Sequence, residues 1–213
     1  MNALHAHLEN KTHVIWDWNG TLLSDIEHAV KTVNRLLKEE NLPLITVGSY
    51  KKVFGFPVSK YYETLGFDTT PSAFLALCER FNQYFYEDLI TACDLWPGAR
   101  ETLRMVKRSG KTQSLLSASE HGMLLESVRR FQVEDLFDHV FGIHDKTAAS
   151  KVERGRELMA RAGSNPNQTV LVGDTDHDLE VADHLGIDVI LVEHGHQCPT
   201  RLRAIHSAVI KVF

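Results

Sequence analysis

The chain has 213 residues, 43% of them hydrophobic, so it can bury the core of one large domain or of a domain that carries an insertion. The formal net charge is −5 and no run of Lys or Arg is present, which argues against a nucleic-acid groove and a membrane-surface role. No apolar stretch reaches the roughly 20 residues of a membrane-spanning helix, and residues 1–13 lack the regions of a signal peptide. We therefore expect a cytoplasmic protein, a monomer or a homodimer, with no nucleic-acid or membrane partner.

The first predicted strand, residues 14–16, leads directly into an aspartate. The strand is apolar on both faces, as strands of a parallel sheet are. Asp17 then emerges at its carboxyl end, where open α/β sheets place their sites, and the turn Gly20-Thr21 follows. The chain therefore presents a carboxylate to a ligand.

A helical block is predicted between residues 24 and 93. Ser24 and Glu27 have the spacing of a capping box, with Ser24 as the N-cap and Glu27 at N3 of the first helix. Further helical stretches are predicted at residues 58–65 and 72–90. No second strand–helix unit begins before the end of this block, so the block interrupts the α/β pattern.

A strand predicted at residues 112–116 leads into small residues that include Ser117 and Ala118. The helix predicted before it, residues 99–109, ends at Gly110, in the order that a βαβ unit requires. A serine at the end of a strand is usually only a turn or cap residue. Its place in the chain order favours a functional role instead.

The strand predicted at residues 169–172 runs into an acidic loop. Three aspartates follow it at alternate positions: Asp174, Asp176 and Asp178. Oxygen ligands on a short loop suit Mg²⁺, which takes one or two carboxylates together with water and phosphate oxygens. Alternatively, the three carboxylates only cap the helix predicted at residues 179–185. The magnesium interpretation is favoured because Asp17 lies at the end of a second strand.

The alternation of strands and helices predicts an α/β fold with a doubly wound, Rossmann-like parallel sheet. Its six strands are predicted at residues 14–16, 112–116, 139–141, 169–172, 189–192 and 208–212. We expect residues 1–23 and 94–213 to form this catalytic core, and residues 24–93 to form an inserted helical domain.

Two segments have a resemblance to known protein motifs. Asp17-Trp18-Asn19-Gly20-Thr21 resembles the first motif, Asp-x-Asp-Gly-Thr, of the haloacid dehalogenase-like hydrolases, and the loop from Gly173 to Asp178 resembles their acidic fourth motif. The resemblance is to the branch that contains phosphoglycolate phosphatases and β-phosphoglucomutases with a helical cap. It implies a Mg²⁺-dependent phosphatase that acts on a small phosphorylated metabolite through an aspartyl-phosphate, with residues 24–93 as the cap.

The same resemblance implies the site residues. The catalytic residues are Asp17, Asn19 and Lys151, and the phosphoryl group is bound by Thr21, Ser117, Ala118 and Lys151. The Mg²⁺ ligands are Asp17, Asp174, the backbone carbonyl of Asn19, and Asp178 as an alternate or supporting ligand. Lys151 is preferred as the family's lysine because it opens the helix predicted at residues 152–162, and Lys146 is the alternative.

Asn19 departs from the family pattern. The family has an aspartate there that donates and recovers the proton of the leaving group, which an amide cannot do. General acid–base catalysis contributes roughly 10²–10⁴-fold, so we expect a preference for acyl, anhydride or aryl phosphates over alkyl esters. The departure keeps open a catalytically weakened phosphoryl-binding or regulatory protein. A phosphomutase, indicated by the segment from Leu116 to Ser119, is a further alternative, although that chemistry needs the missing aspartate.

Three other features carry weaker signals. Residues 54–57, Phe-Gly-Phe-Pro, resemble a turn of such caps and are either a selectivity loop or a buried turn. His194, His196 and Cys198 could hold a metal, but ordinary loop residues are favoured there. His177, inside the acidic loop, is expected to be exposed to solvent.

Overall fold

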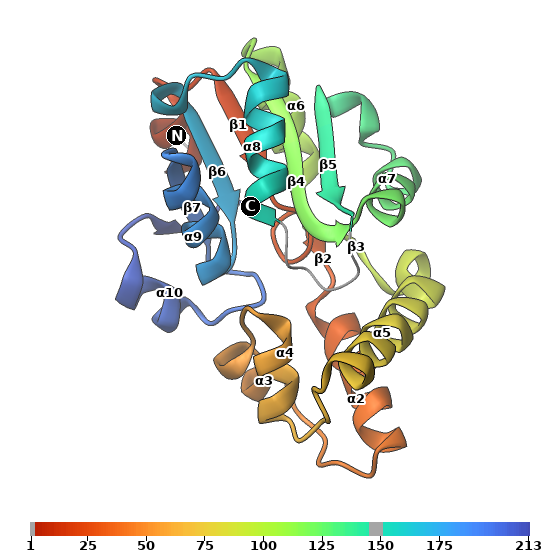
Figure 1. Ribbon diagram of the computed structural model, residues 1–213. Coiled ribbons are helices and arrows are strands. Elements are labelled where there is room, and N and C mark those ends of the chain that lie inside the picture. The colour runs from red at the N-terminus through yellow and green to blue at the C-terminus, as the bar shows by residue number, and fades with distance from the viewer. Residues whose placement is uncertain (1–2, 145–150) are drawn as a thin grey trace.

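The computed structural model describes residues 3–144 and 151–213. Its main sheet has six parallel strands in the order β5-β4-β1-β6-β7-β8. The strands are β1 His13–Trp16, β4 Thr112–Glu120, β5 His139–Ile143, β6 Thr169–Gly173, β7 Asp188–Val192 and β8 Val209–Ile210. The predicted doubly wound fold is confirmed (Figure 1).

The strand order sets the position of the site. The chain runs from β1 outward through β4 to β5, and then returns to the other side of β1 to form β6, β7 and β8. Open α/β sheets bind ligands at the carboxyl ends of the strands where the winding direction reverses. Here that reversal lies between β1 and β6, so Asp17 and Asp174 both lie beside it.

Helices cover both faces of this sheet because successive residues of a strand point to opposite sides. Val14 and Trp16 of β1 pack into the core beneath one group of helices, and Ile15 packs beneath the other. The first group is α1 Ala3–Leu8, α6 Ala99–Arg108 and α7 His121–Arg130. The second group is α8 Lys151–Ala162, α9 Asp176–Leu185 and α10 Pro199–Ile205. Two short 3-10 helices complete this part: Glu134–Leu136 and Pro166–Gln168.

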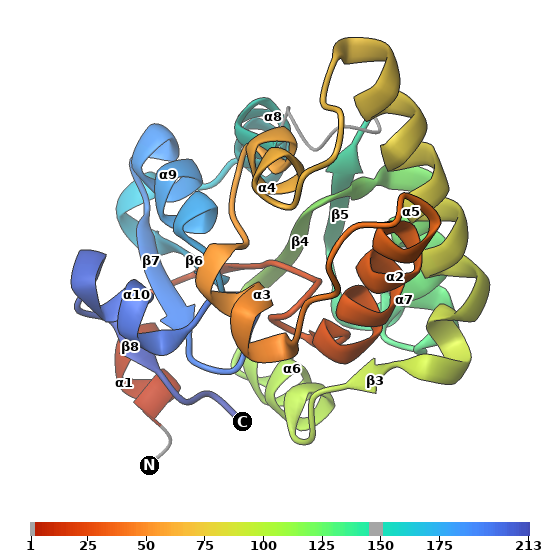
Figure 2. The same ribbon diagram turned by 90° about the horizontal axis from the view of Figure 1, so that it is seen from below.

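The helical block lies beyond the end of the sheet toward which the arrows of β5 and β6 point (Figure 1). It consists of α2 Ile26–Glu39, α3 Val47–Val53, α4 Val58–Thr64 and α5 Pro71–Ala92, and it has its own hydrophobic core. A short antiparallel pair, β2 Leu23–Ser24 and β3 Asp94–Leu95, joins its two ends. Seen from below, α3 and α4 lie in front of the strand ends (Figure 2). We call these four helices and their connections the α2–α5 block; its separate domain status stays a prediction.

The predicted capping box of Ser24 and Glu27 is wrong. Ser24 is extended in β2, because it pairs with Asp94, and Asp25 takes the N-cap position without capping the helix through its side chain. The Asp25 carboxylate instead accepts hydrogen bonds from the loop that follows β1. β4 extends beyond its predicted end to Glu120, whereas β8 is shorter than predicted.

None of the helices in the described ranges combines the length and the apolar character that crossing a bilayer needs.

Candidate active site

Three buried carboxylates gather at the winding reversal of the sheet. Asp17 follows β1, Asp174 follows β6, and Asp178 lies in the first turn of α9. One oxygen of each lies within 4.8 Å of an oxygen of the other two. When all three are ionised, the nearby ammonium group of Lys151 leaves two negative charges in a buried space, which a hard divalent cation would balance. The residues therefore fit a Mg²⁺ ion.

Lys151 links two of the three carboxylates. Its Nζ lies 2.6 Å from Asp17 Oδ1 and 2.6 Å from Asp178 Oδ1, and the side chain is 3% exposed. Burial by itself would lower the pKa of Lys151, but the two carboxylates outweigh it and raise that pKa above its usual value. The lysine therefore keeps its charge inside the site. Lys146, the alternative, lies outside the described residues.

The carboxyl groups respond to the same surroundings in different ways. Burial raises the pKa of Asp17 well above its usual range; Lys151 opposes this shift, while Asp178 and Asp174 add to it. Burial would also raise the pKa of Asp178, but Lys151 and the hydrogen bonds that Asp178 accepts hold it below its usual value. Asp178 therefore stays ionised as the partner of Lys151, and Asp17 is the carboxyl group whose ionisation a bound cation would favour.

Asp178 anchors the loop after β6. Its Oδ2 accepts hydrogen bonds from the backbone N–H of Asp174 at 3.1 Å, from the backbone N–H of Thr175 at 3.0 Å and from the Thr175 hydroxyl at 2.8 Å. A Cβ at Gly173 would collide with this carboxylate, so only glycine fits before the loop. Protein donors thus occupy both oxygens of Asp178, which favours its supporting role over direct ligation.

Asp174 is held by two donors. Its Oδ1 accepts from the Thr21 hydroxyl at 2.8 Å and its Oδ2 from the backbone N–H of His196 at 2.6 Å. Burial, with the charge of Asp178, raises the pKa of Asp174 to about 6, although His196 opposes it. Thr21 is fully buried and does not line the cavity described below. The Thr21 hydroxyl is thus engaged by a buried carboxylate, and its contact with a phosphoryl group stays a prediction.

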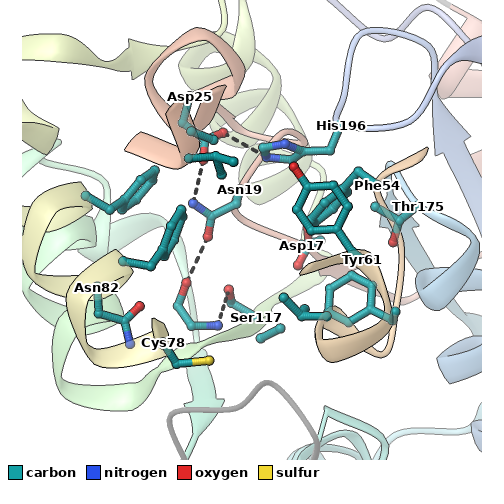
Figure 3. A pocket seen from close by; sticks show the side chains of 18 of the residues that line it. Asp17, Asn19, Asp25, Phe54, Tyr61, Cys78, Asn82, Ser117, Thr175 and His196 are labelled. Atoms are coloured by element: carbon teal, nitrogen blue, oxygen red, sulfur yellow. Dashed lines mark hydrogen bonds and ion pairs between the residues drawn. The ribbon is translucent and has the colours of Figure 1, made fainter. Parts of the chain in front are cut away.

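Ser117 and Ala118 lie on an irregular part of β4. The pairing of β4 with β5 shifts register between Leu116 and Glu120, and such irregularities redirect side chains near sites. The Ser117 hydroxyl accepts a hydrogen bond from the backbone N–H of Ser119 at 3.1 Å. Ser117 and Ala118 line the same cavity as Asp17, and Ser117 is labelled there in Figure 3. Their contact with a phosphoryl group stays a prediction.

The Asn19 amide is fixed at both ends (Figure 3). Its Nδ2 donates to Asp25 Oδ2 at 2.7 Å, and its Oδ1 accepts from the Ser119 hydroxyl at 2.8 Å. Only a side chain that both donates and accepts can make this pair of bonds. A carboxylate at this position would face Asp25 without a proton to share.

Asp25 also binds His196, a residue more than 170 positions away. His196 Nε2 lies 3.3 Å from Asp25 Oδ1, and His196 Nδ1 is hydrogen-bonded to the Tyr50 hydroxyl at 2.9 Å. Burial would lower the pKa of His196, but Asp25 outweighs it and raises that pKa to about 9. Burial would raise the pKa of Asp25, but His196, Asn19 and Gly20 hold it below its usual value. No local pattern in the sequence indicates this ion pair, since His196 stands out only as a weak metal-ligand candidate.

Asn19→Asp is expected to destabilise the protein by about 2–4 kcal/mol at neutral pH, because it leaves a partly buried carboxylate facing the buried carboxylate of Asp25. Adding Asp25→Asn should recover part of this loss, because the amide donor is then supplied from the other side, although His196 loses the carboxylate that pairs with it. Chemical denaturation of both variants checks the prediction. The prediction would be contradicted if Asn19→Asp were as stable as wild type, or if the double variant were less stable than the single variant.

The pairing of His196 with Asp25 is expected to make stability depend on pH. The folded-state pKa of about 9 exceeds the ordinary 6.5, so the contribution is complete below pH 6.5 and is lost as the pH rises through 9. The free energy of unfolding, measured in EDTA from about pH 6 to about pH 10, should fall by up to about 3 kcal/mol from this group. His196→Gln should flatten this part of the profile; an unchanged slope would disprove the assignment.

A cavity of about 170 Å³ connects these groups with the α2–α5 block. Asp17, Asn19, Ser117, Lys151 and Asp174 line its end at the sheet, and aromatic side chains of the block line the remainder. In Figure 3, Cys78 and Asn82 of α5 lie on one side of Asn19, and Phe54 and Tyr61 lie on the other. The site therefore has a charged end and an apolar end.

The loop at residues 54–57 lies between the cavity and the acidic loop. Phe54 and Phe56 line the cavity, and the carbonyl oxygen of Phe54 accepts hydrogen bonds from Gln197 and Arg201. The Phe56 ring stacks on His177 at a centroid distance of 4.3 Å. His177 is accordingly largely covered, with 11% of its side chain exposed, and the expectation of an exposed histidine is wrong.

Comparisons with known proteins agree with this geometry. A family model described as haloacid dehalogenase-like hydrolase matches residues 14–192. The chain is 26% identical over 205 residues to a protein of Dickeya dadantii (strain 3937) named probable phosphatase IndB, a match that covers 94% of this chain and 89% of that protein. It is 25% identical over 190 residues to a phosphoglycolate phosphatase of Haemophilus influenzae (strain 86-028NP), covering 85% of each.

A solved structure of a haloacid dehalogenase-like family hydrolase from Streptococcus pneumoniae shares the fold. The TM-score is 0.81 at 17% sequence identity, and the superposition covers 95% of this chain and 94% of that chain.

Proposed function

The chain belongs to the haloacid dehalogenase-like hydrolases, and on that premise we propose that it is a Mg²⁺-dependent phosphatase that forms an aspartyl-phosphate on Asp17. The substrate is a small phosphorylated metabolite that enters the cavity between the sheet and the α2–α5 block, which acts as a cap. A cytoplasmic location, and a lack of nucleic-acid and membrane partners, stay predictions, as does the choice between a monomer and a homodimer.

The observation that carries the proposal is the pairing of Asp17 with Lys151 at the charged end of the cavity. Among the described residues, Lys151 is the side chain that binds Asp17, and it does so through Oδ1. Oδ2 is thus left to attack a phosphorus atom. The Asp17–phosphorus bond forms while the bond from phosphorus to the leaving oxygen breaks. Water then attacks the same phosphorus, releasing inorganic phosphate and the free carboxylate.

The other residues hold charge in place. Lys151, fixed by Asp178, neutralises negative charge on Asp17 and on the phosphoryl oxygens, and the Ser117 hydroxyl binds one of those oxygens. Asp17, Asp174 and the backbone carbonyl of Asn19 would hold Mg²⁺, which supplies further charge neutralisation when bound. Most catalysis of phosphoryl transfer comes from such positioning and neutralisation. A site without the usual acid can therefore still work.

Because of Asn19, the rate of the reaction depends on how basic the leaving group is. Its amide is held by Asp25 and Ser119, and no proton comes from it to the leaving oxygen. Leaving groups that are weak bases need little protonation, which supports the preference for acyl, anhydride and aryl phosphates. Comparable kcat/KM values for aryl and simple alkyl phosphates would contradict this part of the proposal.

The second candidate function is phosphoryl binding without turnover, and Asn19 is the observation that favours it. The two functions differ in one measurement, the release of inorganic phosphate from acetyl phosphate, phenyl phosphate and phosphoglycolate by the wild-type protein. Release from any of them supports the phosphatase. Binding of these esters without release supports the binding protein.

Removal of divalent cations with EDTA is expected to lower phosphatase activity by at least about 100-fold, because the charge on the carboxylates and the phosphoryl group is then unbalanced. Added Mg²⁺ should restore it. The same titration followed by thermal denaturation should show Mg²⁺ stabilising the protein. Full activity in EDTA would contradict the magnesium site.

A further inference from the structure

The α2–α5 block gives the cavity an aromatic wall. Eight rings from α3, from the loop after it, from α4 and from α5 contribute to it: Tyr50, Phe54, Phe56, Tyr61, Tyr62, Phe81, Phe85 and Tyr86. Several of these rings already pack against one another, for example Phe54 edge-on to Tyr61 and Phe81 stacked on Phe85. The aromatic wall is therefore preformed, and ligand binding would not carry the cost of ordering these side chains.

Among the described residues that line it, the cavity has no unpaired positive charge beyond the phosphoryl site. Its ionisable lining residues, apart from tyrosines and Cys78, are Asp17, Asp25, Glu120, Lys151, Asp174 and His196. Lys151 is bound by Asp17 and Asp178, and His196 by Asp25. A second anionic group on a ligand would thus meet carboxylates and rings, and no unpaired cation among the described residues.

The positive charges of the α2–α5 block lie elsewhere. Arg80 pairs with Glu39 and Glu40, and Arg35 pairs with Glu39 and Glu87. The Lys51 ammonium group donates to the carbonyl oxygen of His194. None of these cations lines the cavity.

One polar atom of the wall has no partner. Tyr61 lines the cavity and is 3% exposed, and its hydroxyl oxygen is buried without a hydrogen-bond partner among the described residues. Buried polar groups are almost always hydrogen-bonded, so an orphaned one beside a cavity points to a bound polar group. Tyr61 thus offers one unused hydrogen bond from a mainly aromatic surface.

We propose that this cavity selects phosphate esters whose leaving group is an uncharged ring with one hydrogen-bonding substituent, and that it rejects esters with a second anionic group, such as phosphoglycolate. An engineered apolar cavity of about 150 Å³ holds benzene, so 170 Å³ suits a single ring. The proposal rests on the proposed function for the phosphoryl end of the site. Phenols are also weakly basic leaving groups, which is what Asn19 requires.

The first test measures binding. In the presence of Mg²⁺, calorimetry should show benzylphosphonate binding at least about tenfold more tightly than 3-phosphonopropionate, a difference of about 1.4 kcal/mol. Asn82→Arg places a cation on the α5 side of the cavity and should narrow or reverse this preference. Gln83→Arg, on the exposed neighbouring residue, is the matched control and should leave it unchanged. Equal binding of the two phosphonates by wild type would overturn the proposal.

The second test concerns the tyrosine. Tyr61→Phe should weaken binding of 3- or 4-hydroxybenzylphosphonate by about fivefold to tenfold and leave benzylphosphonate binding unchanged. Tyr84→Phe, a tyrosine of α5 that lies under Arg35 and outside the cavity, is the control. If Tyr61→Phe changes the affinity for neither hydroxybenzylphosphonate, the assigned hydrogen bond is wrong.

The proposed function and this inference fail separately. If no ester releases phosphate, the phosphatase proposal fails, while the phosphonate affinities still decide the preference for a ring. If phosphate is released but phosphoglycolate is cleaved with a kcat/KM equal to that of phenyl phosphate, the inference fails and the phosphatase stands.

Discussion

Asp17→Asn is expected to lower kcat for every phosphate ester by at least about a thousandfold, because an amide oxygen is a poor nucleophile and forms no stable acyl phosphate. The substitution keeps the size of the side chain, so binding should change far less than turnover. Lys151 keeps its partner Asp178, 2.6 Å away, and the site should remain folded. The kinetic constants of the purified variant check this expectation.

Two further experiments control for other effects of the substitution and test for the covalent intermediate. Asp183→Asn changes an exposed aspartate of α9 and should leave kcat unchanged. Acid-quenched wild-type protein, digested and analysed by mass spectrometry, should carry a phosphoryl group on the peptide that contains Asp17. Activity that survives Asp17→Asn would remove the covalent intermediate from the proposed mechanism.

Lys151→Met is expected to abolish activity and to destabilise the protein by about 3–5 kcal/mol, the range observed when one partner of a buried ion pair is removed. The methionine fills much of the same space but leaves Asp17 and Asp178 without a counter-charge. Adding Asp178→Asn removes one of the unpaired charges and should recover part of the stability without the activity.

Chemical denaturation of the two single variants and the double variant measures this coupling directly. Lys60→Met, on an exposed lysine of α4, is the control and should change stability by less than about 0.5 kcal/mol. If Lys151→Met were as stable as wild type, the lysine would not be the counter-charge of these carboxylates.

Much of the fold could be predicted because its strands are locally distinctive. All six predicted strands of the main sheet are present, although their ends differ by a few residues. The errors occur where tertiary contacts override local preference. Ser24 is a reasonable N-cap by its spacing, but its pairing with Asp94 keeps it extended. The short strands β2 and β3 carry no local pattern, because each depends on a partner about 70 positions away.

The family, the sheet and the candidate nucleophile can be predicted from the amino-acid sequence alone. Asp17, Asp174 and Asp178 follow buried strands, and the winding of a parallel sheet brings such strand ends together. The preference for Lys151 rests on motif order and on its place at the start of a predicted helix, and the structure places its ammonium group between two of these carboxylates.

The surroundings of the nucleophile depend on the tertiary structure. It turned Thr21 toward Asp174, covered His177 with Phe56, and joined Asn19 to Asp25 and Ser119. It also placed the aromatic wall opposite the carboxylates. The physical reason is that hydrogen bonds and charge pairs depend on distances of about 3 Å between groups far apart in the chain, which local periodicity does not encode. The asparagine that departs from the family motif is thus explained by the acid beside it.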